Sequence, residues 1–518
     1  MEEVKSHRSR FRHCRKMELL EFPDRFVFRS VDPEFPDHSF SVGRSDGLIH
    51  PLLEDSCSGT PTKVSTVFGV VGTIRLLAGI YVLVITSCKE VGTRLGFPVF
   101  YVKSMKFLSC NEALKYSTSQ EKRDEAYFMS LLRDVESTPG LFYSYDTDLT
   151  VNLQRACRLA EGREGKPLWK QADPRFVWNR YLLEEMIECK LDGFAIPLVQ
   201  GSFLTIQFML KGLPAKITLI SRRCNRRLGT RMWRRGANLE GATANFIETE
   251  QLVEFEGFRS SFLQMAVSFN SAFGYLPVGE SPYNLQPKVV ERHFLDLTQR
   301  YGEVIAVDLT DKHGDEGQLS SAFAAEMEKL PQVRYVSFDF HHFCGNTNFD
   351  NLQLLHDQIS MAFEKQAMAV WVDHGDEISL EYSGTHALKR DLVRFGRQTM
   401  SGLIKDGMSA LSRYYLNNFQ DGIRQDALDL ISGHYSVRRN GPSPFQLNGF
   451  ESLSYLPVAS AVVVGGLTLT TITLNQAGRQ AHHFVSSVLW AGLAAGIVAV
   501  VKANGRQFCS RPRLCNLR

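Results

Sequence analysis

The stretch VSTVFGVVGTIRLLAGIYVLVITSCKEVG, residues 64–92, decides the fold of the first part of this chain. β-branched residues and glycines alternate along it in short runs, which is typical of strands joined by tight turns. Residues 1–60 before it are polar and contain Pro33, Pro36 and Pro51, so they predict loops or edge strands. We therefore expect a β-rich subdomain, and we place it at residues 1–177.

The second part of the chain alternates between short apolar runs and helical stretches. The apolar runs are FAIPLVQG (194–201), FLTIQFML (203–210), KITLISR (216–222), VIAVDLT (304–310) and VRYVSFDF (333–340). Helix-like stretches such as residues 288–302 separate some of these runs. Because this alternation is typical of an α/β domain, we expect an α/β subdomain over residues 178–450.

Composition and charge exclude several classes of protein. The 518 residues are 44% hydrophobic and 22% charged, as in an ordinary folded protein. The net charge of +3 is too small to indicate a nucleic-acid-binding protein by itself. The ten cysteines include neither a Cys-x2-Cys pair nor a His/Cys cluster at zinc spacing. We expect a reducing compartment, with no structural zinc and no disulfide framework.

Two uncharged runs near the C-terminus predict membrane spans. Residues 456–474 and 484–501 contain no charged side chain, and each is long enough to cross a bilayer core as a helix. A buried helix of a soluble core is the alternative for each run. The tail after them is basic and has no acid, so the positive-inside rule places it in the cytosol. We expect residues 451–518 to form a transmembrane helical hairpin and a basic cytosolic tail.

The densest chemical feature is SRRCNRRLGTRMWRRG, residues 221–236, which holds seven arginines. Clustered guanidinium groups bind phosphate oxygens, and they repel each other unless an anion or acids neutralise them. A solvated basic face is the alternative, whereas nucleic-acid binding is disfavoured because Trp233 is the only aromatic residue in the segment. Glu240, Glu248 and Glu250 follow closely and could orient some of the arginines.

This segment and its continuation carry, in order, SRR, RxGTR, RRGANLEG and ANFIETEQ between Ser221 and Gln251. The run closely resembles the signature of the Sac-domain phosphoinositide phosphatases. The resemblance recurs at residues 69–92, 141–150, 176–179, 338–345 and 375–389. Residues 417–433 look most like the plant members of the family.

The resemblance implies a β-rich N-terminal Sac subdomain and an α/β catalytic subdomain. It implies residence on endoplasmic-reticulum or Golgi membranes. The basic tail and an even number of spans place the soluble region and both termini in the cytosol. The implied activity is hydrolysis of the inositol-ring phosphate of monophosphorylated phosphoinositides by a cysteine thiolate, with no metal or other cofactor. The implied partners are phosphoinositide lipids and the membrane, and no nucleic acid is expected.

The nucleophile loop of the family is the feature that this chain lacks. Sac phosphatases carry a Cys-x5-Arg-Thr loop between the segments that correspond here to residues 338–345 and 375–389. The residues from Asn346 to Gly375 contain no cysteine. A second departure lies at residues 264–287, where the family's Arg-Gly-Ser-Ile-Pro run and its tryptophan are absent. Both departures have sharp edges beside intact family sequence, which is typical of exon skipping or a gene-model error.

Two other cysteines have an arginine six positions later, but neither fits the loop. Cys88 leads into a strand pattern, and Glu90 would lie inside the anion-binding loop. Cys157 follows a helical stretch and lacks the threonine. Cys344 has no such arginine, so we expect it to be a packed core thiol. We therefore assign no catalytic residue and no metal ligand.

The remaining candidates are basic side chains that could attract headgroup phosphates. We assign substrate binding to Arg222, Arg223, Arg227, Arg231 and Arg235, and more weakly to Lys389 and Arg390. The expected function is a membrane-anchored phosphoinositide phosphatase by family that is inactive as this chain. The alternative is a non-catalytic pseudophosphatase that binds phosphoinositides or proteins. Loss of the loop together with its strand also predicts a poorly stable α/β region.

Overall fold

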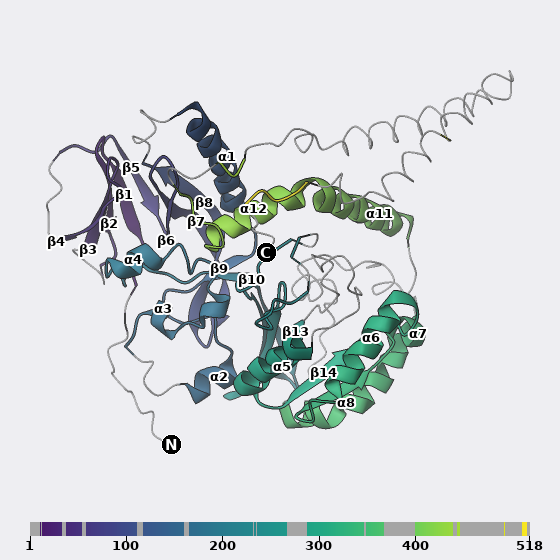
Figure 1. Ribbon diagram of the computed structural model, residues 1–518. Helices are drawn as coiled ribbons and strands as arrows, with labels where there is room; N and C mark the ends of the chain where they lie inside the picture. Colours follow the sequence, from purple (N-terminus) through teal and green to yellow (C-terminus); the bar gives the residue numbers. More distant parts are fainter. Residues whose placement is uncertain are drawn as a thin grey trace, which may run out of the picture.

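The structure is a computed structural model. It describes residues 11, 13–33, 38–53, 59–110, 118–159, 165–230, 233–234, 236–266, 287–345, 349–366, 399–438, 443–445, 492 and 510–514. Its described strands form a five-stranded sheet, an eight-stranded sheet and a two-stranded sheet (Figure 1).

The five-stranded sheet is antiparallel and has the order β4-β3-β2-β1-β5. Its strands are β1 (Met17–Glu21), β2 (Arg25–Ser30), β3 (His38–Gly43), β4 (Ile49–Leu53) and β5 (Lys63–Val67). Residues 1–60 thus supply more regular structure than the polar sequence predicted. Pro51 does lie in the edge strand β4, where a missing backbone N–H is tolerated.

The eight-stranded sheet has the order β13-β12-β11-β10-β9-β8-β7-β6. Its strands are β6 (Gly69–Arg75), β7 (Ile80–Arg94), β8 (Phe97–Ser109), β9 (Leu141–Tyr143), β10 (Val199–Leu210), β11 (Leu213–Arg223), β12 (Ile247–Phe255) and β13 (Phe258–Ala266). The strands predicted within residues 64–92 are confirmed as β5, β6 and β7. The β-rich first part of the fold prediction therefore holds.

Strand β7 shows why this sheet is apolar on both faces. Its alternate residues Tyr81, Leu83 and Ile85 pack into a core against helices α1 (Ser119–Glu136) and α12 (Asp421–Ile431). The intervening Ile80, Val82 and Val84 pack against the five-stranded sheet. At β7 the sheet is thus covered by helices on one side and by the other sheet on the opposite side.

The strands predicted at residues 203–210 and 216–222 are confirmed, but they form an antiparallel hairpin, so the predicted α/β alternation is wrong here. Strands β10 and β11 are joined by Lys211 and Gly212, and β12 and β13 by Glu256 and Gly257. All four turn residues have positive φ, as two-residue hairpin turns require. One sheet therefore contains strands from both sides of residue 177, and the subdomain boundary placed there stays a prediction.

The α/β alternation begins later, at α5 (Pro287–Tyr301). Strands β14 (Val304–Asp308) and β15 (Val333–Ser337) are parallel and are connected through α6 (Gly314–Met327). This region continues with α7 (Phe340–Cys344) and α8 (Leu352–Gln366). Its core contains apolar residues of α5, α6 and the two strands.

Helix α11 (Met400–Tyr415) continues through a π-helical turn, Leu416–Gln420, into α12. The remaining helices are short: α2 (Leu153–Arg158), α3 (Leu168–Gln171) and α4 (Glu184–Glu188). The segment Ser510–Leu514, yellow in Figure 1, lies alongside α12.

Among the described ranges, no helix combines the length and the apolar character that crossing a membrane requires. The predicted spans, residues 456–474 and 484–501, lie outside the described residues apart from Gly492. Residues 375–389 and 267–286 also lie outside them.

Candidate functional site

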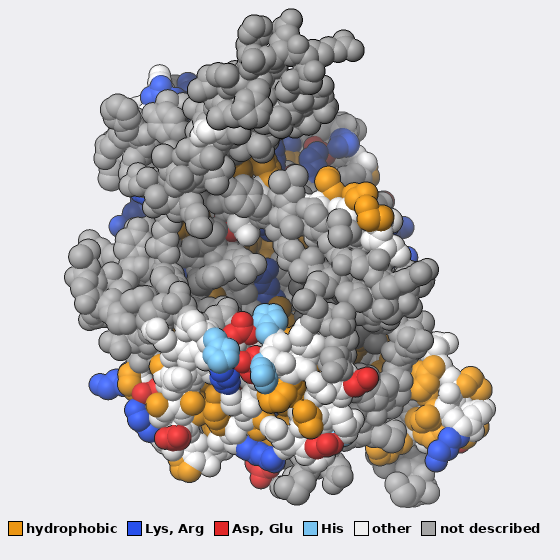
Figure 2. All heavy atoms as spheres, turned by 90° about the vertical axis from the view of Figure 1, so that its right-hand side faces the viewer, with side chains coloured by type: hydrophobic (Ala, Val, Ile, Leu, Met, Phe, Trp, Pro, Cys, Tyr) orange, Lys and Arg blue, Asp and Glu red, His pale blue; other side chains and the backbone are white. Residues whose placement is uncertain are grey.

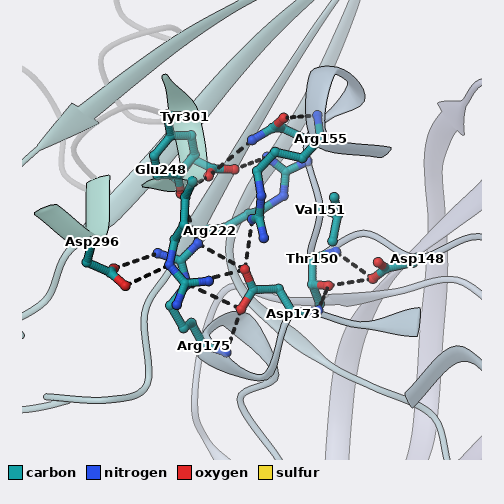
Figure 3. A network of polar contacts seen from close by, with 12 residues as sticks. Asp148, Thr150, Val151, Arg155, Asp173, Arg175, Arg222, Glu248, Asp296 and Tyr301 are labelled. Carbon is teal, nitrogen blue, oxygen red and sulfur yellow. Dashed lines mark hydrogen bonds and ion pairs between the residues drawn. The ribbon is translucent and has the colours of Figure 1, made fainter. Parts of the chain in front are cut away.

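Arg222 lies at the centre of a buried charge network (Figure 3). The antiparallel register of β11 and β12 places Arg222 directly opposite Glu248, and Glu250 is two residues further along β12. Nη1 of Arg222 lies 3.0 Å from a Glu248 carboxylate oxygen, and Nη2 lies 2.5 Å from one of Glu250. Its Nε donates to the carbonyl oxygen of Leu149. All three charged side chains are 0% exposed.

Arg94 at the end of β7 is the second arginine of this network. Its guanidinium donates to the carbonyl oxygens of Asp148 and Val151 and lies 3.7 Å from Glu250. Burial lowers the pKa of Arg94. Burial opposes the charge of Arg222 too, but the carboxylates of Glu250 and Glu248 raise its pKa overall. Two buried arginines thus face two buried glutamates, and their charges balance.

The network extends to the α/β region through Tyr301 of α5. Tyr301 donates to Glu248, and Arg175 donates to Tyr301. Arg175 also pairs with Asp173, which accepts a further hydrogen bond from Arg155. Burial opposes the charge of Asp173, but Arg175 and Arg155 hold its pKa well below its ordinary value. These contacts attach the eight-stranded sheet to the first helix of the α/β region.

The guanidinium of Arg222 is therefore fully engaged inside the protein, by two carboxylates and a backbone carbonyl oxygen. Two of the glutamates that the sequence indicated, Glu248 and Glu250, orient it. Glu240 is not part of the described contacts of Arg222.

Arg223, the next residue along β11, has a different environment. Its guanidinium donates to the side-chain oxygen of Asn245 and the carbonyl oxygen of Gly229, both neutral. Within the described ranges no carboxylate lies at ion-pair distance from it. Burial, together with the nearby charge of Arg424, lowers the pKa of Arg223 to about 10, so it remains charged at neutral pH. This position carries a positive charge that described acids do not compensate.

The other predicted substrate-binding residues are less informative. Arg227 lies in the turn after β11, where its carbonyl oxygen accepts the backbone N–H of Asn245. Arg231, Arg235, Lys389 and Arg390 lie outside the described residues. Arg234, which was not predicted, pairs with Asp429 of α12 at 2.7 Å. Substrate binding by the predicted set stays a prediction.

The described cysteines do not form a nucleophile loop. Cys88 lies inside strand β7, and its partner at position 94 belongs to the buried network. Cys157 lies inside the short helix α2 rather than before a helix N-terminus. Cys344 lies at the end of α7 and is 0% exposed, as the sequence predicted, and burial raises its pKa. None of these three cysteines therefore supplies a thiolate at the start of a helix.

Sequence reasoning missed a polar cluster at the carboxyl ends of β14 and β15. Asp308 ends β14 and accepts hydrogen bonds from Ser320, Thr310, Lys312 and Tyr335. Burial opposes its charge, but the hydrogen bonds from Ser320, Thr310 and Tyr335 hold the pKa of Asp308 at about 2. An acid that directly follows an apolar strand, as in VIAVD, is the signal that could have identified it.

The segment after β15 adds a second acid and histidines to this edge. Asp339 accepts the backbone N–H groups of His342 and Lys312, which lower its pKa. His341 pairs with Asp311, and Asp339 interacts electrostatically with His342 and His313. Figure 2 shows histidines gathered around acidic side chains on this face. Ligands of α/β sheets bind at this kind of edge, but no metal-ligand group is found among the described residues.

Comparison with known proteins identifies the family. The SacI homology domain matches residues 68–345, more than half of the chain. The chain belongs to the Sac-domain phosphoinositide phosphatase family. It is 53% identical to phosphoinositide phosphatase SAC8 of Arabidopsis thaliana, over 99% of this chain and 100% of the relative. It is 39% identical to phosphoinositide phosphatase SAC7 of the same plant, over 96% and 97%. It is 30% identical to phosphatidylinositol-3-phosphatase SAC1-B of Danio rerio, over 86% and 89%.

The length of the first of these alignments bears on the two departures from the Sac pattern. It extends over 589 aligned residues, whereas this chain has 518. At least 71 of the aligned positions therefore have no residue of this chain opposite them. The SacI homology match ends at Gly345, next to the place where the nucleophile loop was expected.

Proposed function

We propose that this chain is a membrane-anchored Sac-family protein that binds phosphoinositide headgroups and does not hydrolyse them. The observation that carries the proposal is the sequence after Cys344, which reaches residues 375–389 without any cysteine. In this family a thiolate performs the attack on phosphorus, and the loop that carries it also holds the phosphate oxygens. Without that loop the first chemical step has no nucleophile.

Three further observations support the proposal. Cys88 lies inside a strand, Cys157 inside a helix and Cys344 in the core, so none of these three occupies a strand-to-helix loop. After β15 the chain enters α7 and then α8, so the described residues supply no third parallel strand in this region. The alignment with the Arabidopsis relative also leaves at least 71 positions without a counterpart in this chain.

The test of the proposal is phosphate release by the full-length chain in detergent micelles containing phosphatidylinositol 3- or 4-phosphate. We expect no release above a boiled sample, because loss of a covalent nucleophile typically costs several orders of magnitude in rate. The matched control is this chain with the corresponding segment of the Arabidopsis relative inserted after Gly345. Turnover by the original chain that is abolished by Cys88→Ser or Cys157→Ser would contradict the proposal.

We also propose that residues 456–474 and 484–501 form a hairpin in the endoplasmic-reticulum or Golgi membrane, with both termini in the cytosol. The uncharged lengths and the basic tail support this arrangement. A glycosylation acceptor in a lengthened 475–483 loop should be modified in the lumen. An acceptor placed after Lys502 should remain unmodified. The opposite pattern, or release of the protein by alkaline carbonate, would overturn the hairpin.

A further inference from the structure

The segment Ser510–Leu514 makes specific contacts with helix α12. The backbone N–H of Arg513 lies 2.7 Å and 3.0 Å from the two carboxylate oxygens of Asp426. The backbone N–H of Leu514 lies 2.7 Å from one of these oxygens. Asp426 itself is 0% exposed. A buried carboxylate on α12 is thus satisfied by the main chain of a segment 87 positions further along the sequence.

The side chains of this segment alternate between the protein interior and solvent. Pro512 and Leu514 are buried, whereas Arg511 and Arg513 are exposed. Leu514 is 2% exposed and belongs to the same core as α1 and α12. The guanidinium of Arg513 lies 5.1 Å from the ring centre of Tyr127 in α1. The segment is therefore held by an acceptor, an apolar socket and an aromatic ring.

Gly422 of α12 supports the same interpretation. A Cβ at this position would lie 2.5 Å from the carbonyl oxygen of Ser510, closer than real Cβ atoms come. Gly422 lies in a helix and does not have positive φ, so the backbone conformation does not require glycine here. Glycine within a helix is less favourable than alanine. Close approach of the C-terminal segment is the feature that requires a glycine at this position.

Phe445, the last described residue before positions 446–509, lies against the same helices. Phe445 packs on Tyr127 and Phe128 of α1, with ring centres 4.3 Å and 5.0 Å apart. The described residues on either side of positions 446–509, Phe445 and the segment Ser510–Leu514, therefore both lie against helices of the same core.

We propose that α1 and α12 form a binding surface whose ligand is the chain's own C-terminal segment, residues 510–514. Docking of this segment ties the far end of residues 446–509 back onto the folded body. The docking does not depend on headgroup binding or on the loss of activity. With the segment docked, the chain contacts the folded body at Phe445, before the predicted membrane hairpin, and again at Leu514, after it.

The first experiment compares Gly422→Ala in the full-length chain and in a variant that ends at Cys509, both in detergent micelles. In the full-length chain the added Cβ collides with Ser510, so the midpoint of thermal unfolding should fall by several degrees. In the shortened variant the collision is removed, and the higher helix propensity of alanine should raise the midpoint. An increase in both backgrounds would overturn the proposal.

A second experiment changes only the segment and leaves every residue of α1 and α12 as it is. With a protease site placed after Arg518, Leu514→Asp should accelerate cleavage of the full-length chain at least tenfold, because a charge cannot occupy the apolar socket. Leu514→Met is the matched control and should change the rate less than twofold. Equal cleavage rates in the three proteins would overturn the proposal.

Dilution tests whether the docked segment belongs to the same chain or to a second copy of it. An intramolecular ligand predicts that the Gly422→Ala effect is the same at all protein concentrations. An effect that disappears on dilution would show that a second copy supplies the segment, and would overturn the assignment to the chain's own C-terminus.

Discussion

The eight-stranded sheet and the two-stranded parallel sheet differ in how completely their apolar residues are covered. Six of the seven residues of β6 are buried, whereas β14 has one buried residue among five. Next to this strand, Leu309 is 50% exposed. Among the described residues β14 and β15 pair only with each other, so each has one unpaired edge there.

Helix α11 shows the same contrast on a helical surface. Met400, Ile404 and Met408 are 75%, 61% and 62% exposed and lie four residues apart, on one face of the helix. An apolar stripe of this kind normally packs against a partner element. In α12, the direct continuation of α11, Leu430 and Ile431 are each 1% exposed. Among the described residues, the apolar side chains of β14 and α11 are therefore less covered than those of β6 and α12.

Restoring the segment that we propose to be missing after Gly345 should have the largest effect on stability, because it should remove the difference in coverage between the two sheets. A central strand would pair the open edges and cover a few hundred Å² of apolar surface, which at about 25 cal/mol per Å² amounts to several kcal/mol at most. That is comparable to the whole stability of a typical domain, about 5–15 kcal/mol. Calorimetry of the full-length chain with and without the segment, in detergent, measures the effect. Equal cooperative transitions would show that the shortened chain already forms a closed structure.

The comparison also explains what could be predicted from the sequence. Strands within residues 64–92 were predictable because glycines and β-branched residues mark their turns and runs. The hairpins of β10 to β13 were not, because runs such as FLTIQFML resemble the buried strands of a parallel sheet. Their turns, Lys211–Gly212 and Glu256–Gly257, lack the Asn-Gly or Asp-Gly pair that signals a hairpin most strongly.

The candidate site was predictable only in part, for a physical reason. The arginine cluster is visible in the sequence, but the strand register is a property of the folded sheet. That register places Arg222 opposite Glu248, whereas Arg223 faces neutral oxygens. Adjacent residues of a strand point to opposite faces, so one arginine became a structural ion pair and its neighbour did not. The docking of residues 510–514 on Asp426 is likewise a contact between distant parts of the chain.

The second largest effect on stability should come from the buried charge network around Arg222, which attaches the eight-stranded sheet to the α/β region. Arg222→Ala leaves Glu248 and Glu250 buried with reduced compensation, and breaking a buried pair in this way costs about 3–5 kcal/mol. The control is Arg226→Ala, since Arg226 is 45% exposed and lies 3.8 Å from Asp296. Exposed pairs contribute about 0–1 kcal/mol. Chemical unfolding of both variants measures the difference, and equal losses would show that the buried network does not support the junction.

A smaller effect should appear in the pH dependence of stability, through Asp426 in the buried helix α12. Burial raises the pKa of Asp426 to about 6, against the backbone N–H groups of Leu514 and Arg513. The pKa of Asp426 is thus higher in the folded than in the unfolded state. Its contribution to the free energy of unfolding is therefore fully present below about pH 4 and is lost as the pH rises through 6. The loss is about 3 kcal/mol at most. Asp426→Asn should lack this decline. Parallel stability curves for the two proteins between pH 4 and 7 would contradict the assignment.

The smallest effect should be on headgroup binding, and it sharpens the comparison between neighbouring arginines. Arg223 keeps a charge that described acids do not neutralise, whereas the charge of Arg222 is balanced by glutamates. A basic side chain near an anionic surface contributes about 1 kcal/mol, so Arg223→Gln should weaken binding to vesicles containing phosphatidylinositol 4-phosphate roughly fivefold.

Arg29→Gln provides the control for that measurement, because it removes the same formal charge from β2, a strand of the other sheet. Arg29 is 50% exposed and pairs with Glu18. If net charge alone attracted the protein to vesicles, the two variants would lose affinity equally. A local headgroup site predicts a loss for Arg223→Gln and a change below twofold for Arg29→Gln. Equal binding by Arg223→Gln and the unmodified chain would instead assign Arg223, like Arg222, to the structure of the sheet.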